Sequence, residues 1–281
     1  MNSTQLLSLY GLKWNPFSPE LPEEALIMNP KVEHFFWRTE QLVKEGGFAL
    51  ITGESGLGKS VALRMLNRRL SQLRDVTVGE IIRPQSSVWD FYCELSTLFS
   101  VNLRMNNRWF GYKTLREKWQ NHIESTTCRP VLLVDEAQEI IPRVLSEIRL
   151  ISSICFDSKS ILTVIFCGDT RLPDKFRTRE LIPLGSRIKA RLMLEPYTKD
   201  ELLGLLSESL ERSGAPGLMT SQLMETLAEH SAGNPRLMMN MAHELLMLGA
   251  KQELQKLDEK LYLEAFATDA PTRRNRKHAV A

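Results

Sequence analysis

The sequence predicts a three-layer α/β domain built on a parallel sheet, followed by a small domain made only of helices. Between residues 46 and 196, short apolar runs alternate with stretches of helical periodicity, as in parallel strands joined by crossover helices. One of these runs passes into a glycine-rich loop and then into a helix. After residue 197 the helical periodicity continues and the sequence shows no convincing strand.

The elements can be placed in chain order. Strands are expected at residues 48–52, 77–83, 131–134, 161–167 and 190–196. The helical domain, residues 197–267, is expected to begin with a capping box from Thr198 to Glu201. Further helices are expected at about 221–231, 236–248 and 257–266, with Gly233 and Asn234 ending one helix and Pro235 starting the next. Residues 268–281 read as a flexible basic tail.

The composition is that of an ordinary globular protein, with 43% hydrophobic and 25% charged residues in 281. A net charge of only +2 means that any contact with nucleic acid depends on local basic patches. Apolar runs stay short of the roughly 18 residues that a membrane span needs, and residues 1–5 lack the features of a secretion signal. We therefore expect a cytoplasmic protein without a membrane span.

The glycine-rich loop has the pattern G-x-x-x-x-G-K-[ST] in the required context of strand, loop and helix. Glycines allow the backbone to turn so that N–H groups at the helix start converge on phosphate oxygens. The lysine would reach the β- and γ-phosphates of ATP, and the final serine would ligate Mg²⁺. The predicted binding residues are Gly53, Glu54, Ser55, Gly56, Leu57, Gly58, Lys59, Ser60 and, at the start of the helix, Val61.

A second motif follows the buried run at residues 131–134, where Asp135 and Glu136 stand side by side. A carboxylate at the end of a parallel strand beside the phosphate loop is placed to hold Mg²⁺, which suits Asp135 together with Ser60. Glu136 can orient and deprotonate a water for attack on the γ-phosphate. The alternative is a pair of acids that only favours the N-terminus of a helix.

With both motifs placed, the chain resembles the AAA+ superfamily, and within it the branch of the ExeA-type secretion ATPases and the MuB- and TniB-like transposition helper ATPases. The resemblance covers nearly the whole chain. It includes residues 10–17, similar to the opening segment of the family, and residues 35–42, similar to the helix that precedes the first strand. It implies that residues 1–45 form an N-terminal segment along the nucleotide edge, before a core at residues 46–196 and a helical lid.

The resemblance also implies three roles. The end of the strand at 161–167 should carry a polar sensor, and Asp169 stands there although the family uses a neutral residue, with Thr170 in reserve. Arg187, or alternatively Arg191, resembles the arginine that reaches the ATP of a neighbouring subunit, which implies a homo-oligomer, a ring or a filament, assembled with ATP. Arg236 matches the second sensor arginine, expected to contact the γ-phosphate from the lid.

A basic and aromatic stretch lies between the second and third predicted strands. In similar initiator-type proteins this region lines the channel of the oligomer, so contacts with duplex DNA are expected from its cations. The alternative is an amphipathic helix with a solvated basic face. Trp109, Tyr112, Leu115 and Trp119 have core spacing and are expected to be packed. The candidate DNA contacts are Arg104, Arg108, Lys113, Arg116 and Lys118.

The resulting hypothesis is a slow, switch-like ATPase that oligomerises on target DNA and recruits a transposase or another recombination protein in DNA transposition. Two alternatives stay open. One is an ExeA-like ATPase that assembles a secretion system, and the other is a replication or clamp-loading factor.

Overall fold

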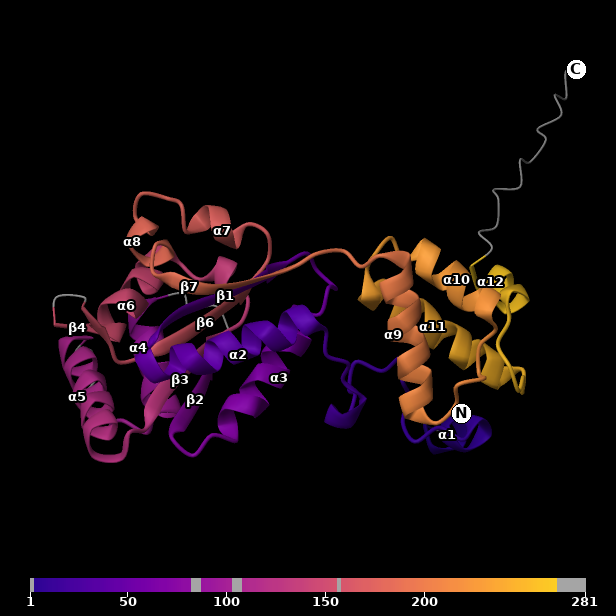
Figure 1. Ribbon diagram of the computed structural model, residues 1–281, viewed down its shortest axis with the longest axis horizontal. Helices are drawn as coiled ribbons and strands as arrows, with labels where there is room; N and C mark the ends of the chain where they lie inside the picture. The colour runs from indigo at the N-terminus through magenta and orange to yellow at the C-terminus, as the bar shows by residue number, and fades with distance from the viewer. Residues whose placement is uncertain (1–2, 82–86, 103–107, 156–157, 267–281) are drawn as a thin grey trace, which may run out of the picture. The chain divides into compact units, whose positions relative to one another are not determined.

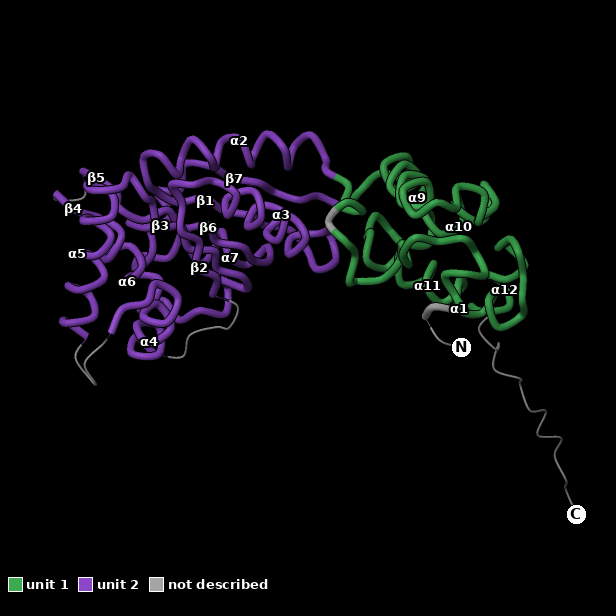
Figure 2. Tube along the Cα trace, turned by 90° about the horizontal axis from the view of Figure 1, so that it is seen from below, with its two compact units in different colours: residues 1–27, 197–281 green, residues 28–196 purple. Residues whose placement is uncertain are grey.

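The computed structural model describes residues 3–81, 87–102, 108–155 and 158–266. The chain divides into two compact units, drawn in different colours in Figure 2. We call residues 28–196 the α/β unit, and residues 1–27 together with 197–281 the helical unit.

The α/β unit contains a five-stranded parallel sheet in the order β2-β3-β6-β1-β7 (Figure 1). The predicted parallel sheet is therefore confirmed. Residues 82–83, the end of the second predicted strand, lie outside the described residues. The strands are β1 (Gly47–Gly53), β2 (Val76–Ile81), β3 (Arg129–Val134), β6 (Thr163–Gly168) and β7 (Ile188–Leu194).

Helices cover both faces of this sheet because its central strands are apolar on both sides. Ile51 of β1 faces the core shared with α2 (Pro30–Glu45) and α3 (Lys59–Ser71). Leu50, the preceding residue, faces the opposite core, which includes α4 (Val88–Leu98), α5 (Arg108–Thr126) and α6 (Pro142–Ser152). This alternation produces the three layers that the sequence predicts.

Local signals explain where the helices begin. Asn29 caps α2, its side chain accepting the Lys31 N–H, and Pro30 occupies the first turn. Two short helices, α7 (Leu172–Lys175) and α8 (Ile182–Gly185), follow β6. A small hairpin of β4 (Ser153–Ile154) and β5 (Lys159–Ser160) was not predicted, because two-residue strands leave no periodicity to detect.

The helical unit packs its helices around a leucine- and methionine-rich core. The predicted capping box of α9 is present, with Thr198 and Glu201 bonding reciprocally. Among the described residues, no helix has both the length and the apolar character to cross a membrane. The elements of this unit are α1 (Ser3–Tyr10), η1 (Glu23–Ala25), α9 (Lys199–Ser213), α10 (Ser221–His230), α11 (Pro235–Lys251) and α12 (Glu259–Phe266).

The N-terminal segment differs from the prediction of one continuous piece at residues 1–45. Residues 1–27 belong to the helical unit, because Leu6, Leu12 and Phe17 are buried in its core. The Lys13 N–H also donates to the Ser213 carbonyl at 2.9 Å. The rest of the segment, mainly α2, packs on the sheet instead.

Candidate nucleotide-binding site

The glycine-rich loop and the acidic motif emerge from the same edge of the sheet. The loop follows β1 and the acidic motif follows β3, and β6 lies between these two strands. Val134 pairs with Phe166, so Asp135 is level with Cys167, which in turn pairs with Ile51. Since neighbouring strands are about 4.8 Å apart, the two motifs are separated by about 10 Å.

The loop adopts a conformation that depends on its glycines. Gly56 and Gly58 have φ values of 89° and 95°, which other residues rarely adopt. Gly58 caps α3 without a side chain, so the first N–H groups of the helix remain available at its positive end. Lys59 is only 8% exposed, and its Nζ donates to the Glu54 carbonyl at 2.9 Å. The lysine is thus folded back over the loop.

The first and last residues of the loop have different surroundings. Gly53 lies so close to β7 that an added Cβ would be 2.8 Å from the Leu194 carbonyl oxygen. Ser60 is exposed in the first turn of α3, where its hydroxyl can reach a ligand.

The acidic motif begins directly after β3. The Asp135 N–H continues the ladder by donating to the Ile81 carbonyl at 3.1 Å, and its carboxylate accepts the Glu136 N–H at 2.9 Å. Glu136 has a left-handed backbone with φ 48°, which turns the chain sharply and leaves its side chain exposed. Asp135 and Glu136 thus form a strained turn that leads into the short helix η2 (Ala137–Glu139).

Cys167, which was not among the predicted site residues, lies in β6, the strand between the two motifs. Its thiol is fully buried, and burial together with the charge and hydrogen bonding of Asp135 raises its pKa above the ordinary value. Lys59 acts in the opposite direction on the same thiol, and Glu136 adds to the effect of Asp135. One buried thiol is therefore within electrostatic range of the lysine and of both carboxylates.

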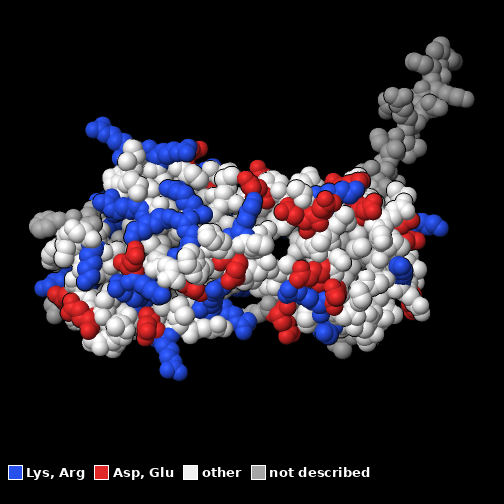
Figure 3. Space-filling model, viewed as in Figure 1, with Lys and Arg blue, Asp and Glu red and all other residues white. Residues whose placement is uncertain are grey.

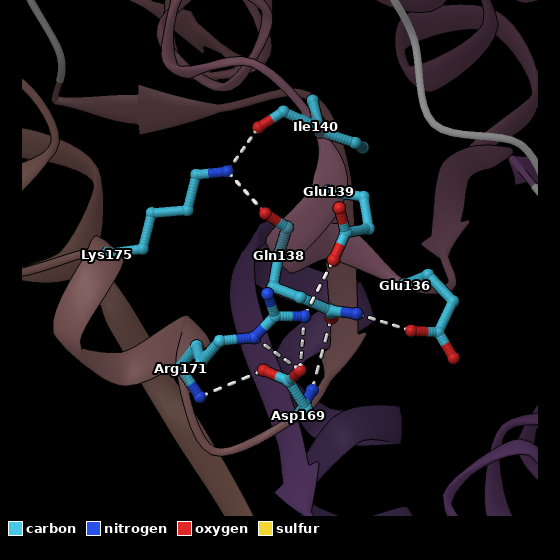
Figure 4. A network of polar contacts seen from close by, with 7 residues as sticks. All are labelled: Glu136, Gln138, Glu139, Ile140, Asp169, Arg171 and Lys175. Atoms are coloured by element: carbon cyan, nitrogen blue, oxygen red, sulfur yellow. Dashed lines mark hydrogen bonds and ion pairs between the residues drawn. The ribbon is translucent and has the colours of Figure 1, made fainter. Parts of the chain in front are cut away.

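A polar network extends from the acidic motif to the end of β6 (Figure 4). The Gln138 side chain donates to the Glu136 carboxylate and accepts the Asp169 N–H at 3.1 Å. Lys175 donates to the carbonyls of Gln138, at 2.6 Å, and Ile140, and burial lowers its pKa.

Asp169, the candidate sensor, is held within this network. Arg171 binds its carboxylate through the backbone N–H at 2.9 Å and through Nε at 2.7 Å, and also contacts Glu139 at 2.7 Å. Partial burial would raise the pKa of Asp169, but the hydrogen bonds and charge of Arg171 outweigh it and lower the pKa. The carboxylate therefore faces a guanidinium, which offsets the charge that makes an aspartate unusual at this position. Sequence reasoning missed Gln138, Arg171 and Lys175, although a basic pair at i, i+4 just after the strand was visible.

The candidate arginines lie in different parts of the chain. Arg187 stands between α8 and β7, half-buried, and contacts the Pro183 carbonyl. Arg191 lies in β7 and donates to the Gly185 carbonyl at 3.2 Å. Arg236 is exposed in the first turn of α11 in the helical unit, directly after Pro235, as predicted. Asn234 was predicted to end the preceding helix, but its side chain accepts the Arg236 and Leu237 N–H groups and so caps the start of α11.

The cations proposed for DNA contact have partners within the protein. Arg108 contacts the buried Glu147, and Arg116 contacts the Tyr112 ring and the Leu150 carbonyl. Lys118 donates to the carbonyls of Phe99 and Ser100, and Lys113 pairs with Glu117 at 3.7 Å. Arg104 lies outside the described residues.

The aromatic residues of α5 divide into two groups. Leu115 and Trp119 are buried as predicted and Tyr112 packs against the same core, but Trp109 is 70% exposed, so its predicted packing is wrong. It lies one turn before Tyr112, beyond the edge of the core, and stacks on the Tyr112 ring with centroids 5.6 Å apart. A pocket of about 300 Å³ beside it is lined by Arg108, Trp109, Tyr112, Glu147 and Leu150.

The side chains at the sheet edge suit a magnesium-bound triphosphate. Ser60 offers a hydroxyl and Asp135 a carboxylate, which are hard oxygen ligands. Within the described part of the chain, no cluster of three or more acidic, histidine or cysteine side chains could hold a metal on its own. Mg²⁺ keeps several waters and binds through few carboxylates together with substrate phosphates, so Ser60 and Asp135 are the residues that would hold it.

The parallel sheet, with a glycine-rich loop between β1 and α3, has the P-loop α/β fold of the AAA+ type. Residues 41–176 match the family model described as an AAA domain.

Two curated proteins are similar over most of the chain. General secretion pathway protein A of Aeromonas hydrophila is 29% identical, over 81% of this chain and 42% of that protein. The chain thus spans less than half the length of this relative. An uncharacterized HTH-type transcriptional regulator of Methanocaldococcus jannaschii is 25% identical, over 91% of this chain and 72% of that protein.

Solved structures share the fold at low identity. The Aeropyrum pernix ORC2 protein, in ADPNP–ADP complexes, has a TM-score of 0.69 at 15% identity, covering 90% of this chain and 71% of that one. The Aeropyrum pernix ORC1 protein in complex with DNA has a TM-score of 0.62 at 17% identity, covering 88% of this chain and 67% of that one.

Proposed function

We propose that this protein binds ATP·Mg²⁺ in its glycine-rich loop and hydrolyses the nucleotide as a slow molecular switch. The observation that carries the proposal is that the loop with Lys59 and the motif of Asp135 and Glu136 leave the same edge of the sheet, after β1 and β3, with only β6 between them. A cation for the phosphates, a carboxylate for the metal and a second carboxylate for water are the three parts that phosphoryl transfer to water requires.

Each part has one role in the proposed reaction. The loop N–H groups and Lys59 bind the β- and γ-phosphates, and Ser60 and Asp135 hold the Mg²⁺, which neutralises charge on those phosphates when bound. Glu136 accepts a proton from water as the water oxygen bonds to the γ-phosphorus. The bond between that phosphorus and the β–γ bridging oxygen breaks, and ADP and phosphate leave. Arg236 is the proposed second sensor.

Substitution of the loop lysine tests nucleotide binding. Lys59→Ala removes a nearly buried cation from the loop and should abolish ATP binding, measured by titration calorimetry with ATP and Mg²⁺. Lys44→Ala is the matched control because Lys44 is exposed on α2, and its ATP affinity should equal that of the unmodified protein. Equal affinity in Lys59→Ala and the control would refute the site.

We further propose that this ATPase regulates DNA transposition and that it does so as an ATP-dependent homo-oligomer on duplex DNA. On the face shown in Figure 3, Lys and Arg are more densely distributed over the α/β unit than over the helical unit, which supports a contact with phosphates. A protein of the same fold, Aeropyrum pernix ORC1, is known in complex with DNA.

A mobility-shift titration tests DNA binding. With ATP, the protein should shift duplex DNA at about 50 mM salt and lose affinity steeply as salt rises. Lys113→Glu reverses an exposed charge on α5 and should weaken binding, whereas Lys44→Glu on α2 is the control. Absence of any shift at low salt would exclude the transposition proposal.

A secretion-assembly ATPase is the second candidate. The 29% identity with General secretion pathway protein A supports it, over the part of that relative that this chain spans. Fractionation of cells that express a tagged protein distinguishes a role in secretion from a role in DNA transposition. Co-purification with an integral membrane partner would favour secretion, and recovery with DNA and a recombinase would favour transposition.

A further inference from the structure

The amide of Gln138 joins the proposed water-activating glutamate to the end of a neighbouring strand. Its Nε2 donates to the Glu136 carboxylate, and its Oε1 accepts the Asp169 N–H at 3.1 Å, just after β6 (Figure 4). The NH₂ group of this side chain therefore contacts the acidic motif, and its oxygen contacts the residue that follows β6.

Chemistry fixes the orientation of this amide. A backbone N–H can only donate, so it must face the amide oxygen, and an ionised carboxylate can only accept, so it must face the NH₂ group. Reversing the amide would place a donor against the Asp169 N–H and an acceptor against Glu136. The bridge therefore has one stable arrangement, with the NH₂ group directed at Glu136.

The surroundings hold Gln138 in place. Lys175 donates to its carbonyl at 2.6 Å, and Arg171 joins Glu139, the next residue, to Asp169. Gly168 provides the space, because an added Cβ there would overlap the Gln138 amide oxygen. The turn at η2 and the end of β6 thus form one connected unit.

Glu136 depends on this bridge. Its side chain is exposed, and within the described residues its carboxylate accepts a hydrogen bond from no side chain other than Gln138. A single donor occupies Oε2 and leaves Oε1 open to a water. Fixing one oxygen of a general base while leaving the other available is the geometry that water activation needs.

We infer that Gln138 is a positioning residue for ATP hydrolysis, which orients Glu136 through its amide NH₂ group and anchors that amide on the Asp169 N–H. The inference rests on the proposed ATPase activity. The NH₂ group of Gln138 has the positioning role, because it donates to Glu136. The amide oxygen has a structural role, because it connects the turn at η2 to the end of β6.

Gln138→Glu separates these two roles, because it keeps an oxygen for the Asp169 N–H and replaces the donor with a second carboxylate. Turnover at neutral pH should fall about tenfold to hundredfold, part of the 10²–10⁴ that a positioned base supplies. The dissociation constant for ATP·Mg²⁺ should stay within about threefold. Gln222→Glu, the same change at an exposed position on α10, should leave both quantities unchanged.

The split between binding and turnover gives a readout that a structural role would not produce. A Gln138→Glu protein that binds ATP·Mg²⁺ with normal affinity but hydrolyses it slowly has lost the donor to Glu136 and has kept the fold of the site. Gly168→Ala should also lower turnover, because its Cβ would displace the Gln138 amide.

The outcomes separate the inference from the function on which it rests. If the unmodified protein neither binds nor hydrolyses ATP, the proposed function fails. If it hydrolyses ATP and Glu136→Gln stops hydrolysis, but Gln138→Glu and Gly168→Ala turn over normally, the inference alone is wrong. Loss of ATP affinity or of thermal stability in parallel with turnover would assign Gln138 a structural role and also overturn it.

Discussion

The Arg108→Ala variant tests quantitatively whether the basic residues of α5 stabilise the fold or bind a ligand. Arg108 lies beside Glu147, which is 3% exposed, and donates to that carboxylate through Nε at 3.2 Å and through a second guanidinium nitrogen. The Tyr92 hydroxyl donates to the same carboxylate at 3.0 Å. Among the described residues, Arg108→Ala would leave this buried carboxylate with the Tyr92 hydroxyl as its one hydrogen-bond donor and with no ion-pair partner.

The expected cost follows from these contacts. Breaking a buried ion pair costs about 3–5 kcal/mol when both partners are buried. The Arg108 side chain is 52% exposed, so water replaces part of what is lost, and we expect about 2 kcal/mol. For a unit of this size, that lowers Tm by about 4–8 °C. Thermal and urea unfolding, followed by circular dichroism, measure both quantities.

Two variants complete this test. Lys113→Ala lies on the same helix but loses only an exposed pair at 3.7 Å, so it should change stability by less than about 0.5 kcal/mol. Adding Glu147→Gln to Arg108→Ala should recover part of the loss, because a neutral amide is easier to bury than an unpaired carboxylate. An Arg108→Ala variant with unchanged Tm and weakened DNA binding would refute the structural role.

Three further predictions follow from the same contacts. Gly53→Ala should destabilise the α/β unit and weaken ATP binding, as measured by unfolding and calorimetry, because its Cβ would overlap the backbone of β7. The pKa of Asp169 is lowered in the folded protein, so the stability it contributes is present above about pH 4 and is lost as pH falls through the folded value. The difference in unfolding free energy between the unmodified protein and Arg171→Ala should therefore shrink in acid. Arg187→Ala should lower turnover only in the assembled protein, and mixing it with Lys59→Ala protein should restore activity if the site is shared between subunits.

The sequence predicted the sheet because the signals involved are local. Apolar runs of strand length and a glycine-rich loop at the end of one of them do not depend on distant residues. The same reasoning placed Thr198 and Pro235 at helix starts, since caps and first-turn prolines act within a few residues.

What the sequence did not reveal depends on three-dimensional neighbours. Leu6 and Leu12 carry no signal that they pack with helices some 200 residues later, so the N-terminal segment was assigned as one piece. Trp109 has the spacing of a core residue, but α5 extends beyond the core at that turn. Gln138 takes on its proposed role only because β3 and β6 are adjacent.

The most direct test of the central claim is single-turnover ATP hydrolysis by Glu136→Gln beside a measurement of ATP binding. The substitution preserves size and hydrogen bonding but removes the base, so ATP·Mg²⁺ should bind with unchanged affinity while hydrolysis falls by about 10²–10⁴-fold. Hydrolysis at the rate of the unmodified protein would show that Glu136 does not activate the water, and would contradict the proposed site.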